Sequence, residues 1–152
     1  MSRSNNNLSA WRRAAQLSAL FLFMLCLCQP VFAFQWQPQQ LPMRIIIDTD
    51  AGVWRDDQHA VTYALLSPEF FEIEAFTAVH SGAGTLEHNF LEVHNIMGLA
   101  GIGGIQVLKG ADHPMPGPGK PVKSEAVDFI IERSKINNGK RLVVLGIGGA
   151  TN

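Results

Sequence analysis

Cysteine is scarce in this chain, and positive charge is not in excess. The two cysteines, Cys26 and Cys28, both lie in an apolar stretch near the N-terminus. A mature chain that begins at Phe34 contains no cysteine, which excludes disulfide bonds and a thiol nucleophile. Removing the residues before Phe34 takes away three arginines and leaves 13 acidic against nine basic side chains, a net charge of about −4. This acidic balance argues against a nucleic-acid-binding surface, which requires a basic patch.

Residues 1–33 have the composition of a cleavable signal peptide. Three arginines precede an apolar core at 17–27, and Val31 and Ala33 are acceptable residues at the positions that a signal peptidase reads. An uncleaved membrane anchor is the alternative, but the apolar core is shorter than the roughly 20 residues that a membrane-spanning helix needs. The sequence therefore predicts a secreted or periplasmic protein without stable membrane association after cleavage. An irregular lead-in at 34–43 is expected to follow.

The stretch from 44 to 57 combines a strand with a dense group of acids. The isoleucines at 45–47 predict a short strand that is apolar on both faces, as strands of parallel sheets are. Asp48 and Asp50 point to the same side if the strand continues through Thr49. Gly52 then interrupts the regular conformation of the chain before a second acidic pair. Four carboxylates fall within ten residues: Asp48, Asp50, Asp56 and Asp57.

Carboxylates this close in sequence favour a divalent cation. Like charges a few ångströms apart disfavour each other's ionised forms unless a cation neutralises them. Hard oxygen ligands suit Ca²⁺ or Mg²⁺ better than zinc. The alternative is structural: Asp56 or Asp57 caps a helix that begins at Gln58, while Asp48 and Asp50 are solvated loop acids. Capping accounts for only one or two of the acids, so the sequence favours the metal site.

The rest of the chain alternates helices and strands. Periodicity and turn residues predict helices at 58–66, 86–100 and 125–135, and strands at 71–80, 105–110 and 142–145. This order predicts right-handed crossovers and an α/β fold, an open parallel sheet with helices on both faces, over residues 44–152. Sites in such sheets lie at the carboxyl ends of the strands. The first strand ends in the acids, the second in His80 and the fourth in the segment 146–152.

Two side chains near this edge have two interpretations each. His80 is either a substrate-binding residue or a polar surface residue at a strand end. Trp54 either stacks on a base or sugar or covers the hydrophobic core. In the helix that follows, Ala60, Tyr63, Ala64 and Leu66 are expected to face inward.

The acidic stretch resembles a known family. Asp-Thr-Asp-x-Gly at 48–52, Asp-Asp at 56–57 and Gly-x-x-Thr-Asn at 148–152 resemble motifs of the inosine-uridine preferring nucleoside hydrolases. Weaker matches lie between them in the family's order, so the resemblance covers the family's N-terminal half. It implies a Ca²⁺-dependent N-glycosyl hydrolase of purine and pyrimidine salvage, which splits a small-molecule ribonucleoside into ribose and base. Assembly into a homo-oligomer is compatible with it.

The resemblance also implies roles for individual residues. Asp50 would be both a Ca²⁺ ligand and the general base that takes a proton from water, and Asp57 would be a further ligand. Thr151 would offer its backbone carbonyl to the metal, and Asp48 would support the metal cluster from behind. Asp56 would accept hydrogen bonds from the sugar hydroxyls.

The chain departs from the family pattern in several places. Three residues, instead of one, separate Gly52 from the acidic pair. Ala83 stands where the family has an asparagine whose side-chain amide helps to hold the sugar. The sequence stops at Asn152, in a strand-to-helix turn, before the half of the family that carries another metal-binding aspartate and a histidine near the leaving base. The chain is therefore expected to be a fragment that is inactive alone.

Two other functions fit parts of the pattern. An exported nucleoside- or sugar-binding protein, or a degenerate homologue without activity, is compatible with Ala83 and the incomplete site. A haloacid-dehalogenase-type phosphatase also begins with a strand and Asp-x-Asp, the first acid being its nucleophile. That enzyme has no need of the second acidic pair, and it requires a lysine and further acids that cannot be placed in this sequence.

Overall fold

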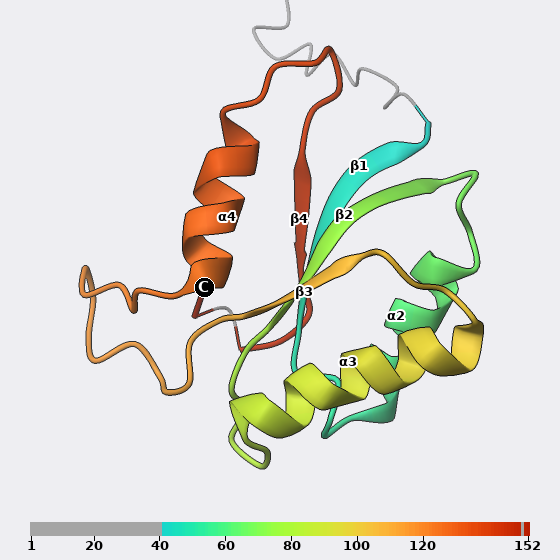
Figure 1. Ribbon diagram of the computed structural model, residues 1–152. Helices are drawn as coiled ribbons and strands as arrows, with labels where there is room; N and C mark the ends of the chain where they lie inside the picture. The colour runs from blue at the N-terminus through green and yellow to red at the C-terminus, as the bar shows by residue number, and fades with distance from the viewer. Residues whose placement is uncertain (1–40, 150) are drawn as a thin grey trace, which may run out of the picture. The chain divides into compact units, whose positions relative to one another are not determined.

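The computed structural model describes residues 41–149 and 151–152, and in this part of the chain four strands and three helices alternate (Figure 1). The strands are β1 (Met43–Thr49), β2 (Phe71–Ala78), β3 (Gln106–Lys109) and β4 (Val143–Gly146), and the helices are α2 (Arg55–Leu65), α3 (Leu86–Ala100) and α4 (Glu125–Ser134). The signal peptide predicted at 1–33 lies outside the described residues. Within the described residues, no helix has both the length and the apolar composition that crossing a membrane requires.

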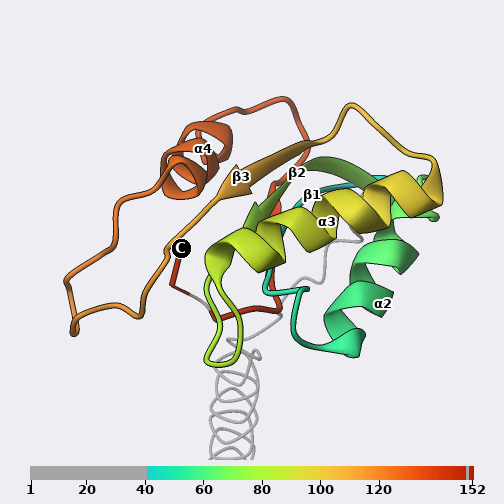
Figure 2. The ribbon, with the colours of Figure 1, turned by 60° about the horizontal axis from the view of Figure 1, so that its bottom comes forward.

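The strands form one parallel sheet in the order β3-β2-β1-β4. The connections from β1 to β2 and from β2 to β3 run in one direction across the sheet, whereas the connection from β3 returns past β2 and β1 to β4. Because parallel crossovers are right-handed, this reversal places α4 on the face opposite to α2 and α3. Figures 1 and 2 show these two layers of helices on either side of the sheet. The predicted α/β fold is therefore confirmed.

Local signals account for the ends of two helices. The Thr85 side chain accepts a hydrogen bond from His88 N at the start of α3, and the Ser124 side chain accepts one from Val127 N at the start of α4, both at 3.2 Å. At the end of α3, Gly101 adopts a left-handed conformation with φ 68°, which glycine tolerates without strain. These residues explain why the bounds of α3 agree with the prediction from sequence.

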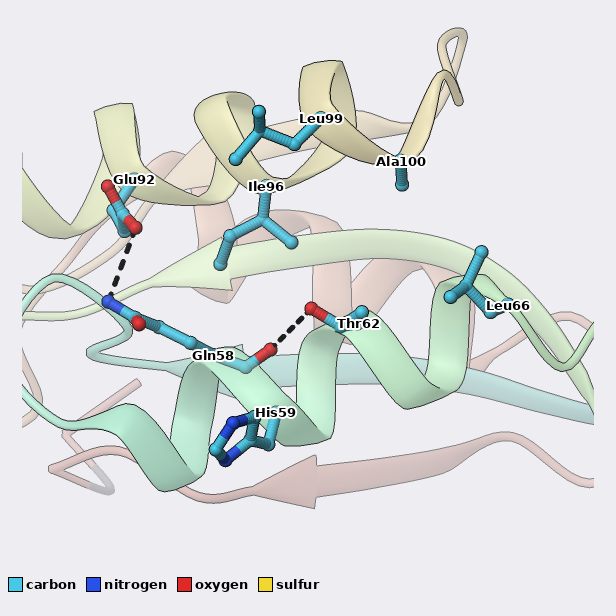
Figure 3. A pocket seen from close by; sticks show the side chains of 8 residues that line it. All are labelled: Gln58, His59, Thr62, Leu66, Glu92, Ile96, Leu99 and Ala100. Atoms are coloured by element: carbon cyan, nitrogen blue, oxygen red, sulfur yellow. Dashed lines mark hydrogen bonds between the residues drawn. The ribbon is translucent and has the colours of Figure 1, made fainter.

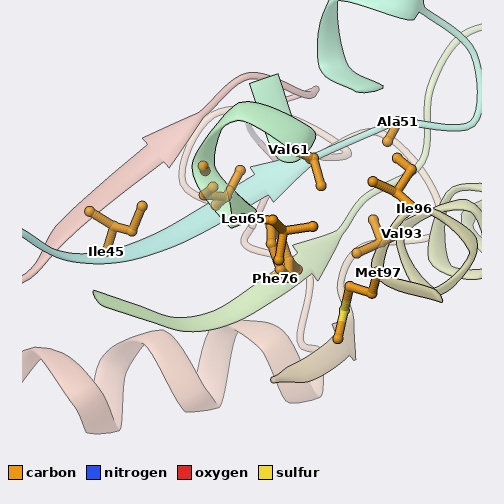
Figure 4. Close-up of a cluster of buried hydrophobic side chains, with 10 residues drawn as sticks. Ile45, Ala51, Val61, Leu65, Phe76, Val93, Ile96 and Met97 are labelled. Carbon is orange, nitrogen blue, oxygen red and sulfur yellow. The ribbon is translucent and has the colours of Figure 1, made fainter. Parts of the chain in front are cut away.

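The main core lies between the sheet and the helices α2 and α3. Figure 4 shows Ile45 from β1 and Phe76 from β2 among aliphatic side chains of the two helices. Ile46, between Ile45 and Ile47 on β1, is also fully buried, so β1 is apolar on both faces as predicted. Complete burial of an isoleucine or phenylalanine stabilises a fold by about 1.5–3 kcal/mol. This core fixes β1, and with it the acids at the end of the strand.

Two boundaries near the acids differ from the prediction. The strand β1 begins at Met43, the last residue of the expected lead-in, because Met43 N already donates a hydrogen bond of 2.7 Å to Phe70 O. The helix α2 begins at Arg55 instead of Gln58, and its N-cap position is occupied by Trp54, whose side chain makes no capping hydrogen bond. Asp56 and Asp57 therefore lie inside the first turn, and the structural alternative that one of them is the helix cap is wrong.

The inward face of α2 also differs from the prediction. Ala60, Tyr63 and Leu66 are exposed, whereas Val61 and Leu65 are buried, and only Ala64 of the four expected residues faces inward. The cause is a polar contact. Thr49 Oγ1 donates a hydrogen bond of 2.7 Å to Asp57 Oδ1, which turns the Asp57 side of the helix toward the sheet.

Candidate active site at the carboxyl edge of the sheet

The acids lie where the direction of the chain connections reverses. After β1 the chain crosses to β2 on one side, whereas β4 pairs with β1 from the other side, with Asp48 opposite Gly146. Ile147 N and Gly148 N both donate hydrogen bonds to Asp48 O, at 2.8 and 3.1 Å. The fourth strand therefore lies directly beside the first. Ligands of open α/β sheets bind at such a reversal, outside the carboxyl ends of the strands.

Asp48 is a buried carboxylate that is held by two side chains. Its Oδ1 accepts hydrogen bonds of 2.6 Å from Thr77 Oγ1 on β2 and of 2.6 Å from Asn152 Nδ2. Burial raises the pKa of Asp48, and the two hydrogen bonds oppose this effect by favouring the charged form. Asp48 therefore links three segments of the chain behind the more exposed edge of the site.

Asp50 and Asp57 bring two further carboxylates to this edge. Asp50 is 8% exposed and Asp57 is 5% exposed. Burial is the largest cause of the raised pKa of Asp50, and the negative charge of Asp57 raises this pKa further. The strand ends at Thr49, so Asp50 belongs to the following turn, which Val53 N closes onto Asp50 O at 3.2 Å. Two acids are thus close enough to repel each other at this edge of the sheet.

The turn that carries Asp50 is packed against α3. Gly52 N donates a hydrogen bond of 3.1 Å to Asn89 Oδ1, and Asn89 Nδ2 donates one of 2.7 Å to Val79 O just beyond β2. Asn89 is fully buried. A Cβ atom on Gly52 would lie 2.6 Å from Asn89 Oδ1, so only glycine permits this contact. Asn89 thereby fixes the position of the turn relative to the end of β2.

The other predicted site residues differ in exposure. Within the described residues, His80 Nε2 and Thr151 Oγ1 are buried and have no hydrogen-bond partner, which is unusual for polar atoms and marks them as candidates for ligand contact. Asp56 is exposed on the first turn of α2. Trp54 is 59% exposed, so the interpretation that it covers the hydrophobic core is wrong. Its indole ring is free to meet a ligand.

The oxygen atoms at this edge fit a hard divalent cation as part of its ligand set. Within the described residues, no three His, Cys, Asp or Glu side chains converge closely enough to hold a metal ion by themselves. Asp50 and Asp57 provide two buried carboxylates whose repulsion a cation would relieve. Ca²⁺ takes about six to eight oxygen ligands, including backbone carbonyls, and so requires donors beyond these two.

Gly148 allows the segment after β4 to approach β1. A Cβ atom on Gly148 would lie 2.7 Å from Val79 Cγ1 and 2.9 Å from both Thr49 C and Asp50 N. Two of these atoms belong to backbone and cannot move easily. Replacing Gly148 by alanine is therefore expected to push the segment away from Asp50 and to lower the free energy of unfolding by about 1–3 kcal/mol, as overpacking does. Urea denaturation of the full-length protein measures this loss.

Gly146→Ala is the matched control for Gly148→Ala. A Cβ atom on Gly146 meets nothing within 4 Å, although the residue lies on the same segment. The control is expected to change stability by less than about 0.5 kcal/mol, as surface substitutions do. Equal losses in the two variants would contradict the close approach of Gly148 to β1.

Several polar residues of the site were not predicted from the sequence. Thr49, Thr77, Asn89 and Asn152 hold the acids or their loop. Thr77 and Asn89 belong to no sequence motif, whereas Thr49 lies within Asp-Thr-Asp-x-Gly and Asn152 ends Gly-x-x-Thr-Asn, without a predicted role of their own. The alternation of β1 was the only further signal, since it places Thr49 and Asp48 on opposite faces.

A separate groove runs between α2 and α3, away from the acids. It has a volume of about 390 Å³, and Gln58 and Glu92 face each other across it with a hydrogen bond of 3.2 Å (Figure 3). The rest of its lining is mainly apolar, with Leu66, Ile96 and Leu99. None of the predicted site residues lines this groove, so the candidate site remains at the carboxyl edge of the sheet.

The fold and the site define an α/β protein with an acidic, oxygen-rich site at the reversal point of an open parallel sheet. Residues 45–152 match the family model described as inosine-uridine preferring nucleoside hydrolase, and the chain belongs to this family. None of the curated proteins compared with the chain matches it. Membership of the family makes this a hydrolase that acts on nucleosides, which are small-molecule substrates, and the family is metal-dependent in general. The resemblance drawn from the acidic motif is confirmed.

Proposed function

We propose that the full-length protein hydrolyses the N-glycosidic bond of ribonucleosides with Ca²⁺ bound at the carboxyl edge of the sheet. The observation that carries the proposal is the burial of Asp50 beside Asp57 at the reversal point, in a chain of the nucleoside hydrolase family. Export through the signal peptide predicted at 1–33 belongs to the same proposal and makes the enzyme secreted or periplasmic.

Three residues of this chain would hold the cation. Asp50 and Asp57 offer carboxylate oxygens, and Thr151 offers its backbone carbonyl. Asp48 supports the cluster from behind, because Thr77 and Asn152 both donate to its Oδ1. The chemistry that a bound divalent cation supplies at such a site is the activation and orientation of a water molecule.

The side chains of the site have separate tasks in the reaction. Asp50 accepts a proton from the attacking water while the water oxygen bonds to the anomeric carbon. The bond from that carbon to the base nitrogen breaks, and its electron pair leaves with the base. Asp56, exposed beside the site, accepts hydrogen bonds from the sugar hydroxyls, which strengthen as the oxocarbenium-like transition state forms. His80 Nε2, buried and unpartnered, provides a further polar contact for the substrate.

Removal of the metal is expected to stop the reaction. Loss of a Lewis acid worth several kcal/mol lowers the rate by at least about 100-fold, since each 1.36 kcal/mol is about tenfold. The full-length protein, treated with a chelator and assayed for ribose release from inosine and uridine, is expected to lose this activity. Added Ca²⁺ should restore it more effectively than Mg²⁺, because flexible oxygen ligands suit the larger ion.

Two results would contradict the proposal. Ribose release that is unchanged by the chelator would rule out the metal-dependent mechanism. Tight nucleoside binding without ribose release, measured with Ca²⁺ present, would favour the exported binding protein or the degenerate homologue.

A further inference from the structure

The side-chain amide of Asn152 connects the carboxyl ends of the strands. Its Nδ2 donates a hydrogen bond of 2.6 Å to Asp48 Oδ1 at the end of β1. Its Oδ1 accepts a hydrogen bond of 2.7 Å from Ala111 N, just beyond β3. The same Asp48 oxygen accepts a hydrogen bond of 2.6 Å from Thr77 Oγ1 on β2. One planar amide therefore ties the segment after β4 directly to β1 and β3, and through Asp48 to β2.

The backbone at Gly110 is shaped to receive this amide. A Cβ atom on Gly110 would lie 2.2 Å from both Asn152 Nδ2 and Asn152 Oδ1, so the amide fills the space that any other side chain would need. Gly110 N donates a hydrogen bond of 2.7 Å to Ala78 O, which keeps the backbone in place. Gly110 is not among the glycines with positive φ. Glycine is therefore required at 110 for space and not for an unusual backbone conformation.

The segment between the two attachments carries Thr151. On one side, Gly148 N donates to Asp48 O at 3.1 Å, and on the other side the Asn152 side chain is held by Asp48 and Ala111. Thr151 thus lies between two attachments, the Gly148 amide on one side and the Asn152 side chain on the other, and each of them bonds to Asp48. The Oδ1 atom of Asp48 accepts hydrogen bonds from both Thr77 and Asn152.

We propose that Asn152 is a positioning residue of the active site, which holds the backbone of Thr151 at the edge of the sheet where Asp50 lies, with Asp48 as its anchor. The inference rests on the proposed function, in which the Thr151 carbonyl is offered to Ca²⁺. Groups that orient metal ligands from behind typically contribute about 10–100-fold to metal affinity or activity. Asn152 reaches no reacting atom and acts only through its neighbours.

Two substitutions in the full-length protein break this contact by different routes. Asn152→Ala removes the amide, and Gly110→Ala places a methyl group where the amide lies. Each is expected to lower either the affinity for Ca²⁺ or kcat at saturating Ca²⁺ by about 10–100-fold. Calorimetric titration measures the affinity. Gly103→Ala is the matched control, because a Cβ atom there meets nothing within 4 Å. A second readout needs no activity: the Ala111 amide should exchange its hydrogen faster in both variants when Ca²⁺ is chelated.

The double variant Gly110→Ala with Asn152→Ala gives the sharpest result. If the methyl group acts only by displacing the amide, adding it to Asn152→Ala causes no further loss of Ca²⁺ affinity or kcat. Independent losses that multiply would show that Gly110→Ala acts through backbone strain and would overturn the inference. Wild-type Ca²⁺ affinity and kcat in Asn152→Ala, despite faster exchange at Ala111, would also overturn it and leave the proposed function intact. A wild-type protein that neither binds Ca²⁺ nor releases ribose would overturn both.

Discussion

Replacing Asp50 by asparagine is expected to lower the turnover of ribonucleosides by about 10²- to 10⁴-fold while the protein stays folded. Asparagine keeps the size of the side chain but removes the group that takes the proton of the attacking water. It also removes one negative charge from the proposed metal site. The two roles fail together, so kcat and Ca²⁺ affinity should fall in the same variant. Ribose release by the full-length protein and calorimetric Ca²⁺ titration measure the two effects.

The Asp50→Asn variant is also expected to keep its stability. Burial and the charge of Asp57 raise the pKa of Asp50, which means that the folded protein disfavours the ionised carboxylate. At a pH above that pKa, the Asp50→Asn variant without Ca²⁺ should therefore be at least as stable against unfolding as the wild type without Ca²⁺. Stability that is kept while activity is lost is typical of a residue that is retained for function.

Asp128→Asn is the matched control for Asp50→Asn. Asp128 is exposed in the first turn of α4, on the other face of the sheet from α2. The same change of chemistry there should leave kcat and Ca²⁺ affinity unchanged. Asp56→Ala is informative in a different way, because it should lower kcat through the lost sugar contact while metal binding persists. Ribose release near the wild-type rate in Asp50→Asn would show that the proposed mechanism is wrong.

Local signals in the sequence were sufficient for most of the fold. The bounds of α3 follow from the capping hydroxyl of Thr85 and the glycine at 101, and the parallel sheet follows from the alternation of strands and helices. The start of α2 could not be predicted in the same way, because Trp54 occupies the cap position without a capping side chain. The inward face of α2 depends on the contact between Asp57 and Thr49, which belong to different elements.

The candidate site could be predicted from residue chemistry alone only where its residues share one short stretch, whereas His80 followed from its place at a strand end and Thr151 from the family resemblance. Asp48, Asp50, Asp56 and Asp57 fall within ten residues, and the repulsion of their charges is apparent from the sequence. The contacts that hold the site join distant residues. Asp48 meets Thr77 across 29 positions and Asn152 across 104 positions. Such pairs arise from the order of the strands, which local periodicity does not contain.

Replacing Glu74 by glutamine is expected to lower the free energy of unfolding by about 3–5 kcal/mol, because it leaves a buried arginine without its counter-charge. Glu74 on β2 receives hydrogen bonds from Arg44 on β1 and, at 2.6 Å, from Arg133 Nε on α4. The side chains of Arg44 and Glu74 are 1% and 7% exposed. The Arg44 guanidinium also donates to Arg133 O and Ile136 O, at 2.8 and 3.2 Å. This network attaches the end of α4 to the sheet, at the opposite end of β1 from the acids.

Glu72→Gln is the matched control for Glu74→Gln, because Glu72 lies two residues away on β2 and pairs with Lys140 at the surface. Exposed pairs of this kind contribute only about 0.2–1 kcal/mol, so the control should lose little stability. Urea denaturation near neutral pH compares the two variants in the full-length protein. Equal losses would show that the buried network is not the cause.

The pH dependence of unfolding gives an independent test of the same network. Burial alone would raise the pKa of Glu74, but the hydrogen bonds and charges of Arg133 and Arg44 outweigh it and hold the pKa below its ordinary value of 4.5. Between the two values the unfolded chain binds more protons than the folded protein, so this part of the stability is complete above pH 4.5 and is lost as the pH falls through the folded pKa. Glu74→Gln carries no such proton and should show a smaller loss of stability on acidification than the wild type. An identical acid dependence in the two proteins would mean that the pKa of Glu74 is the same in the folded and unfolded states, and it would contradict the charge network at this end of the sheet.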